Sequence, residues 1–207
     1  MDKLIQKINK LRNSELKKKI DKRLSEFRLM NKKGDREWFS ELCFCLLTAN
    51  TSAEMGLRVQ KHLGYEGFTT HKTQEELADR LKNAKSRFYN TRACYIHLAN
   101  EHKDIKKKLL EQKDKRQWLV DNIKGLSYKE ASHFLRNIGF FEYAIIDKHI
   151  LRLMHENRMI KEIPKSMNKK YYFEYEKILG KLADKVKMQQ GELDPYLWYM
   201  KTGKVLK

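Results

Sequence analysis

A lysine and an aspartate that could carry out chemistry lie in one short stretch, KGLSYKEASHFLRNIGFFEYAIIDKHILRLM. Lys129 follows a glycine-containing turn, and Asp147 lies 147 − 129 = 18 residues further along the chain. A lysine amine can act as a nucleophile, and a carboxylate can stabilise positive charge in a transition state. Structural roles are also open, because Lys129 could be a solvated lysine and Asp147 a helix cap. The pair is therefore a candidate reaction site, and the residues around it must decide between a chemical and a structural role.

The turn before the lysine reads Ile123-Lys124-Gly125-Leu126-Ser127, and helical spacing of apolar residues continues on both sides of it. This pattern is typical of a helix-hairpin-helix. Gly125 permits the sharp backbone, while Ile123 and Leu126 would anchor the turn in the core. Backbone amides at the start of the second helix suit a DNA phosphate. We expect Lys124, Gly125, Leu126 and Ser127 to contact DNA backbone, with an ordinary corner between two helices as the alternative.

Composition indicates a folded protein with a polyanionic partner. The 207 residues include 45 Lys and Arg against 27 Asp and Glu, which gives 45 − 27 = +18, and aromatic residues make up 11%. Such an excess of positive charge is most often found in proteins that bind a polyanion, and nucleic acid is the leading candidate. The three cysteines form no CxxC pair and the histidines no HExxH pattern, so we expect no cofactor and no catalytic metal. An ion at the hairpin carbonyls stays open. We expect a cytoplasmic protein without a membrane anchor.

Apolar residues recur at helical spacing, and only two prolines interrupt the chain, so the sequence predicts an all-α protein. Helices are expected at residues 2–30 with a break near Asn13, then at 36–50, 52–63, 73–83, 89–101, 105–111, 115–123, 128–138, 148–158, 168–189 and 195–200. The helix over 36–50 is apolar on nearly all sides and should be buried. We expect two helical lobes with a cleft between them. Residues 35–139 would form one lobe, and residues 1–34 and 140–207 the other.

The helix over 128–138 shows two faces. Helical spacing places one set of apolar residues together, namely Ala131, Phe134, Leu135 and Ile138. A second set falls largely on the opposite face, namely Lys129, Ser132, His133 and Arg136. Asp147 stands where it would cap the next helix.

The hairpin, the lysine and the aspartate occur in the order that resembles the helix-hairpin-helix DNA glycosylase superfamily. Upstream, LLTANTSAEMGLRV looks like its buried helix and DNA-inserting loop, and RFYNTRACYIHLA looks like its FYxxKAxxI segment. No four-cysteine motif follows Asp147, unlike in endonuclease III. A short chain that ends in lysine is similar to the archaeal-type second family of 8-oxoguanine DNA glycosylase/AP lyases. Ser127 and Tyr128 replace the glycine and basic residue often found there, which predicts a slightly different hairpin geometry.

The resemblance implies a base-excision enzyme that acts, as a monomer, on double-stranded DNA containing 8-oxoguanine. Lys129 would attack C1′ and form an imine, which permits β-elimination of the 3′ phosphate, and Asp147 would stabilise the sugar cation and shuttle a proton. Attack needs the neutral amine, which is scarce at neutral pH because the reference pKa of lysine is about 10.4. Partial burial and neighbouring cations would favour the neutral form.

The resemblance also implies residues for recognition, because the damaged nucleotide must leave the base stack. Asn50 would contact the orphaned partner base. Trp198, with Phe88 as the second choice, would stack on the extruded base. Lys207 would help to distinguish 8-oxoguanine, which carries a hydrogen on N7, from guanine. Two other functions stay open, a glycosylase for oxidised pyrimidines and a non-catalytic module that only holds DNA.

Overall fold

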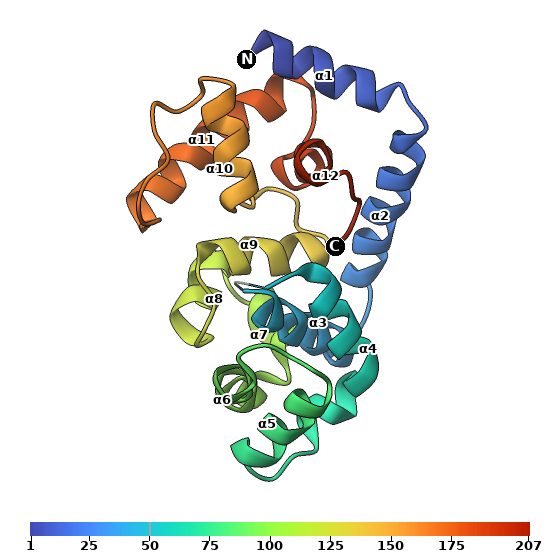
Figure 1. Cartoon of the computed structure of the whole chain (residues 1–207). Coiled ribbons are helices and arrows are strands. Elements are labelled where there is room, and N and C mark those ends of the chain that lie inside the picture. The colour runs from blue at the N-terminus through green and yellow to red at the C-terminus, as the bar shows by residue number, and fades with distance from the viewer. Residues whose placement is uncertain (50) are drawn as a thin grey trace. The chain divides into compact units, whose positions relative to one another are not determined.

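The chain is built from helices and turns, and no strand occurs in residues 1–49 and 51–207, which the computed structural model describes (Figure 1). The prediction of an all-α protein is therefore confirmed. The helices are α1 (Asp2–Arg12), α2 (Leu16–Asn31), α3 (Asp35–Thr48), α4 (Ala53–Thr69), α5 (Gln74–Asn83), α6 (Tyr89–Ala99), the short 3-10 turn η1 (Asn100–His102), α7 (Ile105–Leu110), α8 (Lys115–Asn122), α9 (Tyr128–Asn137), α10 (Lys148–Glu156), α11 (Lys169–Lys185) and α12 (Gln190–Thr202).

Three helix boundaries differ from the prediction by more than two residues. Helix α4 continues past residue 63 to Thr69, with a kink at Gly64, whose φ is 62°. Helix α11 ends at Lys185, because Lys187 adopts a φ of 55° and the Met188 amide donates to the Ala183 carbonyl at 3.0 Å, which closes the helix. The last helix starts at Gln190 and contains Pro195.

Local capping explains the early start of α12. The amide of Gln189 donates to Glu192 Oε2 at 3.1 Å, which forms a capping box before the proline is reached. Pro195 removes one i→i−4 hydrogen bond and its ring crowds the carbonyl four residues earlier, yet the helix that begins upstream continues through it. The break expected near Asn13 is confirmed, since α1 ends at Arg12 and α2 begins at Leu16.

The chain divides into two compact units, and each is described by itself. Unit 1 comprises Met1–Leu29 and Leu135–Lys207, and unit 2 comprises Met30–Phe134. Helix α9 contributes residues 128–134 to unit 2 and residues 135–137 to unit 1.

Helix α3 forms the core of unit 2. Every residue from Leu42 to Leu47 is fully buried, as are Trp38 and Phe39, so the prediction of a buried helix is confirmed. Helices α4, α6 and α7 pack against α3. The indole of Trp38 donates to the Met30 carbonyl at 2.9 Å, which satisfies its only polar group.

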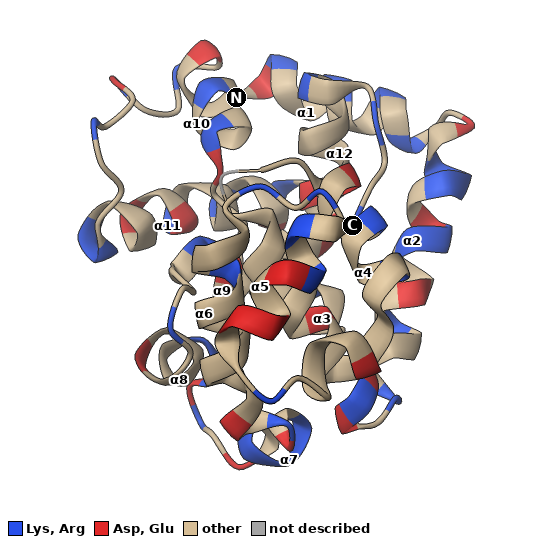
Figure 2. Cartoon of the chain, turned by 60° about the horizontal axis from the view of Figure 1, so that its bottom comes forward, with Lys and Arg blue, Asp and Glu red and all other residues tan. Residues whose placement is uncertain are grey.

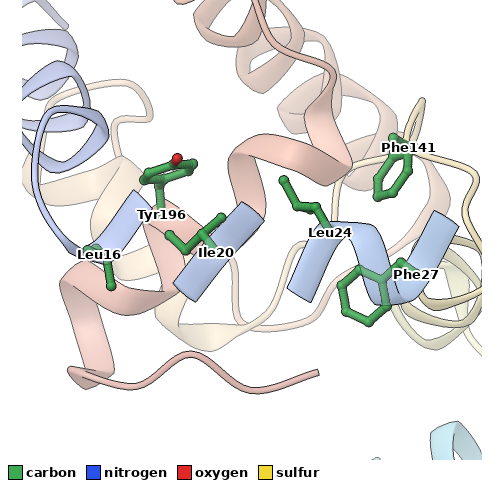
Figure 3. Close-up of a cluster of buried hydrophobic side chains, with 6 residues drawn as sticks. All are labelled: Leu16, Ile20, Leu24, Phe27, Phe141 and Tyr196. Carbon is green, nitrogen blue, oxygen red and sulfur yellow. The ribbon is translucent and has the colours of Figure 1, made fainter. Parts of the chain in front are cut away.

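Unit 1 is organised around α2 and α12. Side chains from one face of α2 meet Phe141 and Tyr196, and together they form a buried cluster of Leu16, Ile20, Leu24, Phe27, Phe141 and Tyr196 (Figure 3). Helix α12 also packs against α1, α10 and α11. Val205, from the segment after α12, is partly buried against the same cluster.

The polar face predicted for α9 is buried, which the sequence pattern did not indicate. Residues 131–138 are all buried, and the polar ones among them have partners. Arg116 Nη1 donates to Ser132 Oγ at 3.3 Å, and His133 packs edge-on against Phe44 with ring centroids 5.8 Å apart. Arg136 Nη1 donates to Asp194 Oδ2 at 3.1 Å. These tertiary partners offset part of the cost of burying the polar groups of this helix.

The ion pair between Arg136 and Asp194 ties the end of α9 to α12. The two side chains are only 4% and 10% exposed. The guanidinium carbon of Arg136 also lies 4.6 Å from the centre of the Phe27 ring. Loss of one member would leave the other charge buried without its partner.

Asp194→Ala should lower the free energy of unfolding by about 3–5 kcal/mol, because it leaves the Arg136 guanidinium uncompensated. Urea denaturation followed by circular dichroism measures this change. Glu156→Gln is the control, because it breaks a more exposed pair, between Glu156 of α10 and Lys201 of α12. That control should cost less than about 1 kcal/mol. Equal effects of the two substitutions would contradict a special role for the buried pair.

Candidate active site and DNA-contacting hairpin

The residues before Lys129 form a tight hairpin between α8 and α9. Helix α8 ends at Asn122 and α9 begins at Tyr128. The Leu126 amide donates to the Ile123 carbonyl at 3.2 Å and closes the turn. Ile123 and Leu126 are 1% and 6% exposed, so the prediction that they anchor the turn is confirmed. Lys124 is exposed, as a residue that contacts DNA phosphate requires.

Gly125 has both the backbone conformation and the close packing that require glycine. Its φ is 95°, a region that other residues rarely adopt. A Cβ atom at this position would collide with the ring of Tyr95, which belongs to α6. The hairpin is therefore packed directly against α6, and a larger residue would displace it.

Glu130 holds the first turn of α9. Its Oε2 accepts a hydrogen bond from the Ser127 amide at 3.3 Å and a second, shorter one from the Ser127 hydroxyl. The departure of Ser127 from the glycine of the superfamily pattern thus adds a contact. One of the amides expected to suit a phosphate is consequently engaged by Glu130 in this structure.

Lys129 is partly buried beside that same carboxylate. Its side chain is 23% exposed, and its Nζ lies 3.4 Å from Glu130 Oε1. The side chain is partly buried, as predicted, and a carboxylate is one of its neighbours.

Asp147 is held at the start of α10 by two backbone amides. Its Oδ1 accepts hydrogen bonds from the amides of His149 and Ile150, both at 2.8 Å, so the predicted cap is confirmed. These bonds use one carboxylate oxygen and fix the orientation of the other, Oδ2. Capping and electrostatic stabilisation of a cation are therefore compatible in the same side chain.

The segment that leads to Asp147 is fastened to α11. Tyr172 donates its hydroxyl hydrogen to the Ala144 carbonyl at 2.7 Å, and the Ala144 amide donates to Glu176 Oε1 at 3.0 Å. All three residues are buried. Although residues 140–147 form no helix, their backbone is fixed before α10 begins. This anchoring determines where the Asp147 carboxylate is placed within unit 1.

Trp198 and Lys207 also belong to unit 1. The Trp198 ring is half-buried on α12 and packs edge-on against His149, with centroids 6.5 Å apart. Since the His149 amide binds Asp147, the indole lies in the neighbourhood of the candidate carboxylate. Lys207 is partly buried.

Phe88 belongs to unit 2 and precedes α6. It is 51% exposed, has a φ of 54°, and carries the Arg87 guanidinium 5.0 Å from its ring centre. An exposed aromatic ring in this position can stack on a base. Asn50, the expected contact for the partner base, lies outside the described residues.

Comparison with known proteins identifies the family of the chain. A family model for 8-oxoguanine DNA glycosylase matches residues 20–188. The chain belongs to the 8-oxoguanine DNA glycosylase family. A relative from Methanocaldococcus jannaschii named 8-oxoguanine DNA glycosylase/AP lyase is 52% identical over 99% of both chains. One from Korarchaeum cryptofilum with the same name is 44% identical over 100% of this chain and 99% of the relative.

Solved structures of this glycosylase family have the same fold. The M. jannaschii 8-oxoguanine glycosylase/lyase, crystallised with a 15mer DNA containing 8-oxoguanine, is 51% identical, matches with a TM-score of 0.95, and covers 99% of each chain. The 8-oxoguanine DNA glycosylase of Thermotoga maritima is 41% identical, with a TM-score of 0.91 over 100% of this chain and 99% of that one.

The basic residues of this glycosylase are distributed over both units. Lys and Arg occur along α2, α10 and α11 of unit 1 and along α7 of unit 2 (Figure 2). Outside residue 50, no group of three or more His, Cys, Asp or Glu side chains is arranged to hold a metal ion. None of the described helices is long and apolar enough to cross a membrane.

Sequence reasoning missed Glu130 as a residue of the candidate site. The spacing S-x-x-E from Ser127 to Glu130 is a known signature of a helix start and could have indicated the contact. The adjacency of Glu130 to Lys129 could not, because consecutive helical residues do not normally face each other.

Gly125→Ala should weaken binding to any DNA duplex by about tenfold or more, because the added methyl group collides with Tyr95 and displaces the hairpin. Fluorescence anisotropy with undamaged and damaged duplexes measures the loss, which should be equal for both because the hairpin contacts backbone. Gly203→Ala, where the φ is 70° but no atom lies within 4 Å, controls for backbone strain alone. Unchanged affinity in Gly125→Ala would show that the hairpin does not grip DNA.

Proposed function

We propose that this protein excises 8-oxoguanine from DNA and then cuts the abasic strand by β-elimination. The observation that carries the proposal is the hairpin with Lys129 directly after it, in a chain that is 51% identical to a glycosylase/lyase solved with 8-oxoguanine DNA. DNA is the partner, and the high positive charge of the protein suits a polyanion. The action of a single copy of the chain, in the cytoplasm, is part of the proposal.

Asp147 and Lys129 divide the chemistry. Cleavage of the bond between C1′ and the base leaves positive charge on the sugar, which the Asp147 carboxylate stabilises. The neutral amine of Lys129 forms a bond to C1′. The bond between C1′ and the base breaks, its electrons leave with the base, and the base takes up a proton. Opening of the sugar ring then yields an imine between Lys129 and C1′. Loss of a proton from C2′ expels the 3′ phosphate, which breaks the strand.

Recognition of the base falls to aromatic and basic side chains. The half-buried indole of Trp198 offers a face for the extruded purine, and the exposed ring of Phe88 is a second stacking candidate. A main-chain oxygen of Lys207 accepts a hydrogen bond from the N7 hydrogen of 8-oxoguanine and repels the bare N7 of guanine. Asn50 contacts the partner base, and Lys124, Gly125, Leu126 and Ser127 hold the backbone.

Lys129→Gln should abolish strand cleavage while it leaves duplex affinity within about threefold, because it removes the nucleophile but only one of many positive charges. Asp147→Asn should slow base release by about 10²–10³-fold, as expected for loss of one preorganised electrostatic group. Asparagine is a good N-cap, so the second variant keeps the fold of α10. Single-turnover assays with separate detection of free base and nicked strand measure both effects.

The control is Lys107→Gln, which replaces an exposed lysine of α7 in the same unit. It should retain both activities. A duplex with an oxidised pyrimidine in place of 8-oxoguanine tests the other lesion class. Faster base release from that duplex would show that the substrate is an oxidised pyrimidine. A nicking activity that persists in Lys129→Gln would show that Lys129 is not the nucleophile. Salt-dependent binding without release of either base would favour a module that only holds DNA.

A further inference from the structure

A buried carboxylate lies directly against the nucleophile of the proposed reaction. Glu130 Oε1 is 3.4 Å from Lys129 Nζ, and the two side chains are 11% and 23% exposed. A surface pair would be screened by water, but this one is largely shielded from solvent, which strengthens the attraction between the charges. The contact lies wholly within unit 2.

Several groups keep the Glu130 carboxylate charged and in place. Burial opposes its charged form, but the Lys129 ammonium and the hydrogen bonds from Ser127 outweigh that effect, so the pKa of Glu130 is lowered from its usual value. From α6, Arg92 is close enough to gain stabilisation from the same carboxylate. Arg92 is 5% exposed, and its Nε is buried without a hydrogen-bond partner.

The other charged and titratable groups along this part of α9 have contacts of their own. Arg116, from α8, donates to Ser132 Oγ at 3.3 Å and lies 5.8 Å from the centre of the Tyr128 ring. His133 packs against Phe44 of α3. Arg92 also donates to the Ala49 carbonyl through a short hydrogen bond. Glu130 forms the ion pair with Lys129.

We propose that Glu130 is a positioning residue that engages Lys129 Nζ in an ion pair in the DNA-free protein, so that the amine can attack only when this ion pair is broken. The proposal rests on the role of Lys129 in the proposed function. Before attack, the ammonium loses one proton to water, and the freed lone pair forms the bond to C1′. The ion pair keeps the amine from reacting with unrelated aldehydes until a substrate displaces the lysine.

Glu130→Gln tests the proposal, because it removes the charge but keeps the shape. Glutamine also serves at the third position of a capping box, so the start of α9 should persist. Reductive methylation of the DNA-free protein with formaldehyde and cyanoborohydride reports on neutral amines, and peptide mass spectrometry assigns the rate to each lysine. At about pH 7, Lys129 should react about tenfold faster in Glu130→Gln than in the wild type, because the carboxylate no longer engages its Nζ.

Two controls separate a local effect from a general one. Lys201, which is paired with Glu156 in unit 1, should react at the same rate in both proteins. Glu66→Gln makes the same substitution in an exposed pair with Arg36 of unit 2, and it should leave the Lys129 rate unchanged. If Glu130→Gln fails to fold, Glu130→Asp withdraws the carboxylate by one methylene group and should give a smaller acceleration in the same direction.

Equal or slower methylation of Lys129 in the folded variant would overturn the proposal. The readout needs no DNA, so it stands apart from the proposed function. If methylation of Lys129 is accelerated but the protein cuts no damaged duplex, the role of Glu130 is supported and the proposed function is contradicted. If the protein cuts the duplex but methylation of Lys129 is not accelerated, the proposed function is supported and the role of Glu130 is contradicted.

Discussion

The burial of helix α9 is the constraint on which the rest of the structure depends. This helix supplies residues to both units, and every side chain from Ala131 to Ile138 is buried. Burial of a polar group is costly unless it has a hydrogen-bond partner. Ser132 and Arg136 therefore require polar side chains opposite them. Arg116 and Asp194 meet that need from α8 and α12. A helix fixed so completely can present the residue at its first turn, Lys129, in one orientation.

The same principle fixes the acidic residue of the proposed chemistry. Asp147 is oriented by the amides that it caps, and the segment before it is fastened to Tyr172 and Glu176. Neither Lys129 nor Asp147 depends on a long flexible loop for its position. Catalysis by charge stabilisation requires groups that are already oriented before the substrate arrives. The helix starts and the anchored segment supply that orientation within each unit.

Local sequence signals predicted much of the fold and part of the site. The hairpin around Gly125 and the cap at Asp147 could be predicted because their partners lie within a few residues along the chain. The buried helix α3 could be predicted because its apolar residues cover every face. The burial of Arg136 could not, since its partner Asp194 is 58 residues away. The start of α12 was missed because the capping box at Gln189 outweighs the helix-breaking signal of Pro195.

Identification of the amino group that becomes attached to damaged DNA tests the central claim most directly. The measurement is borohydride reduction of the protein with a duplex that contains one 8-oxoguanine, followed by proteolysis and mass spectrometry of the DNA-linked peptide. The account predicts a single modified residue, Lys129, in the peptide that follows the hairpin. Attachment through another lysine, or the absence of any linked peptide while base is released, would contradict it.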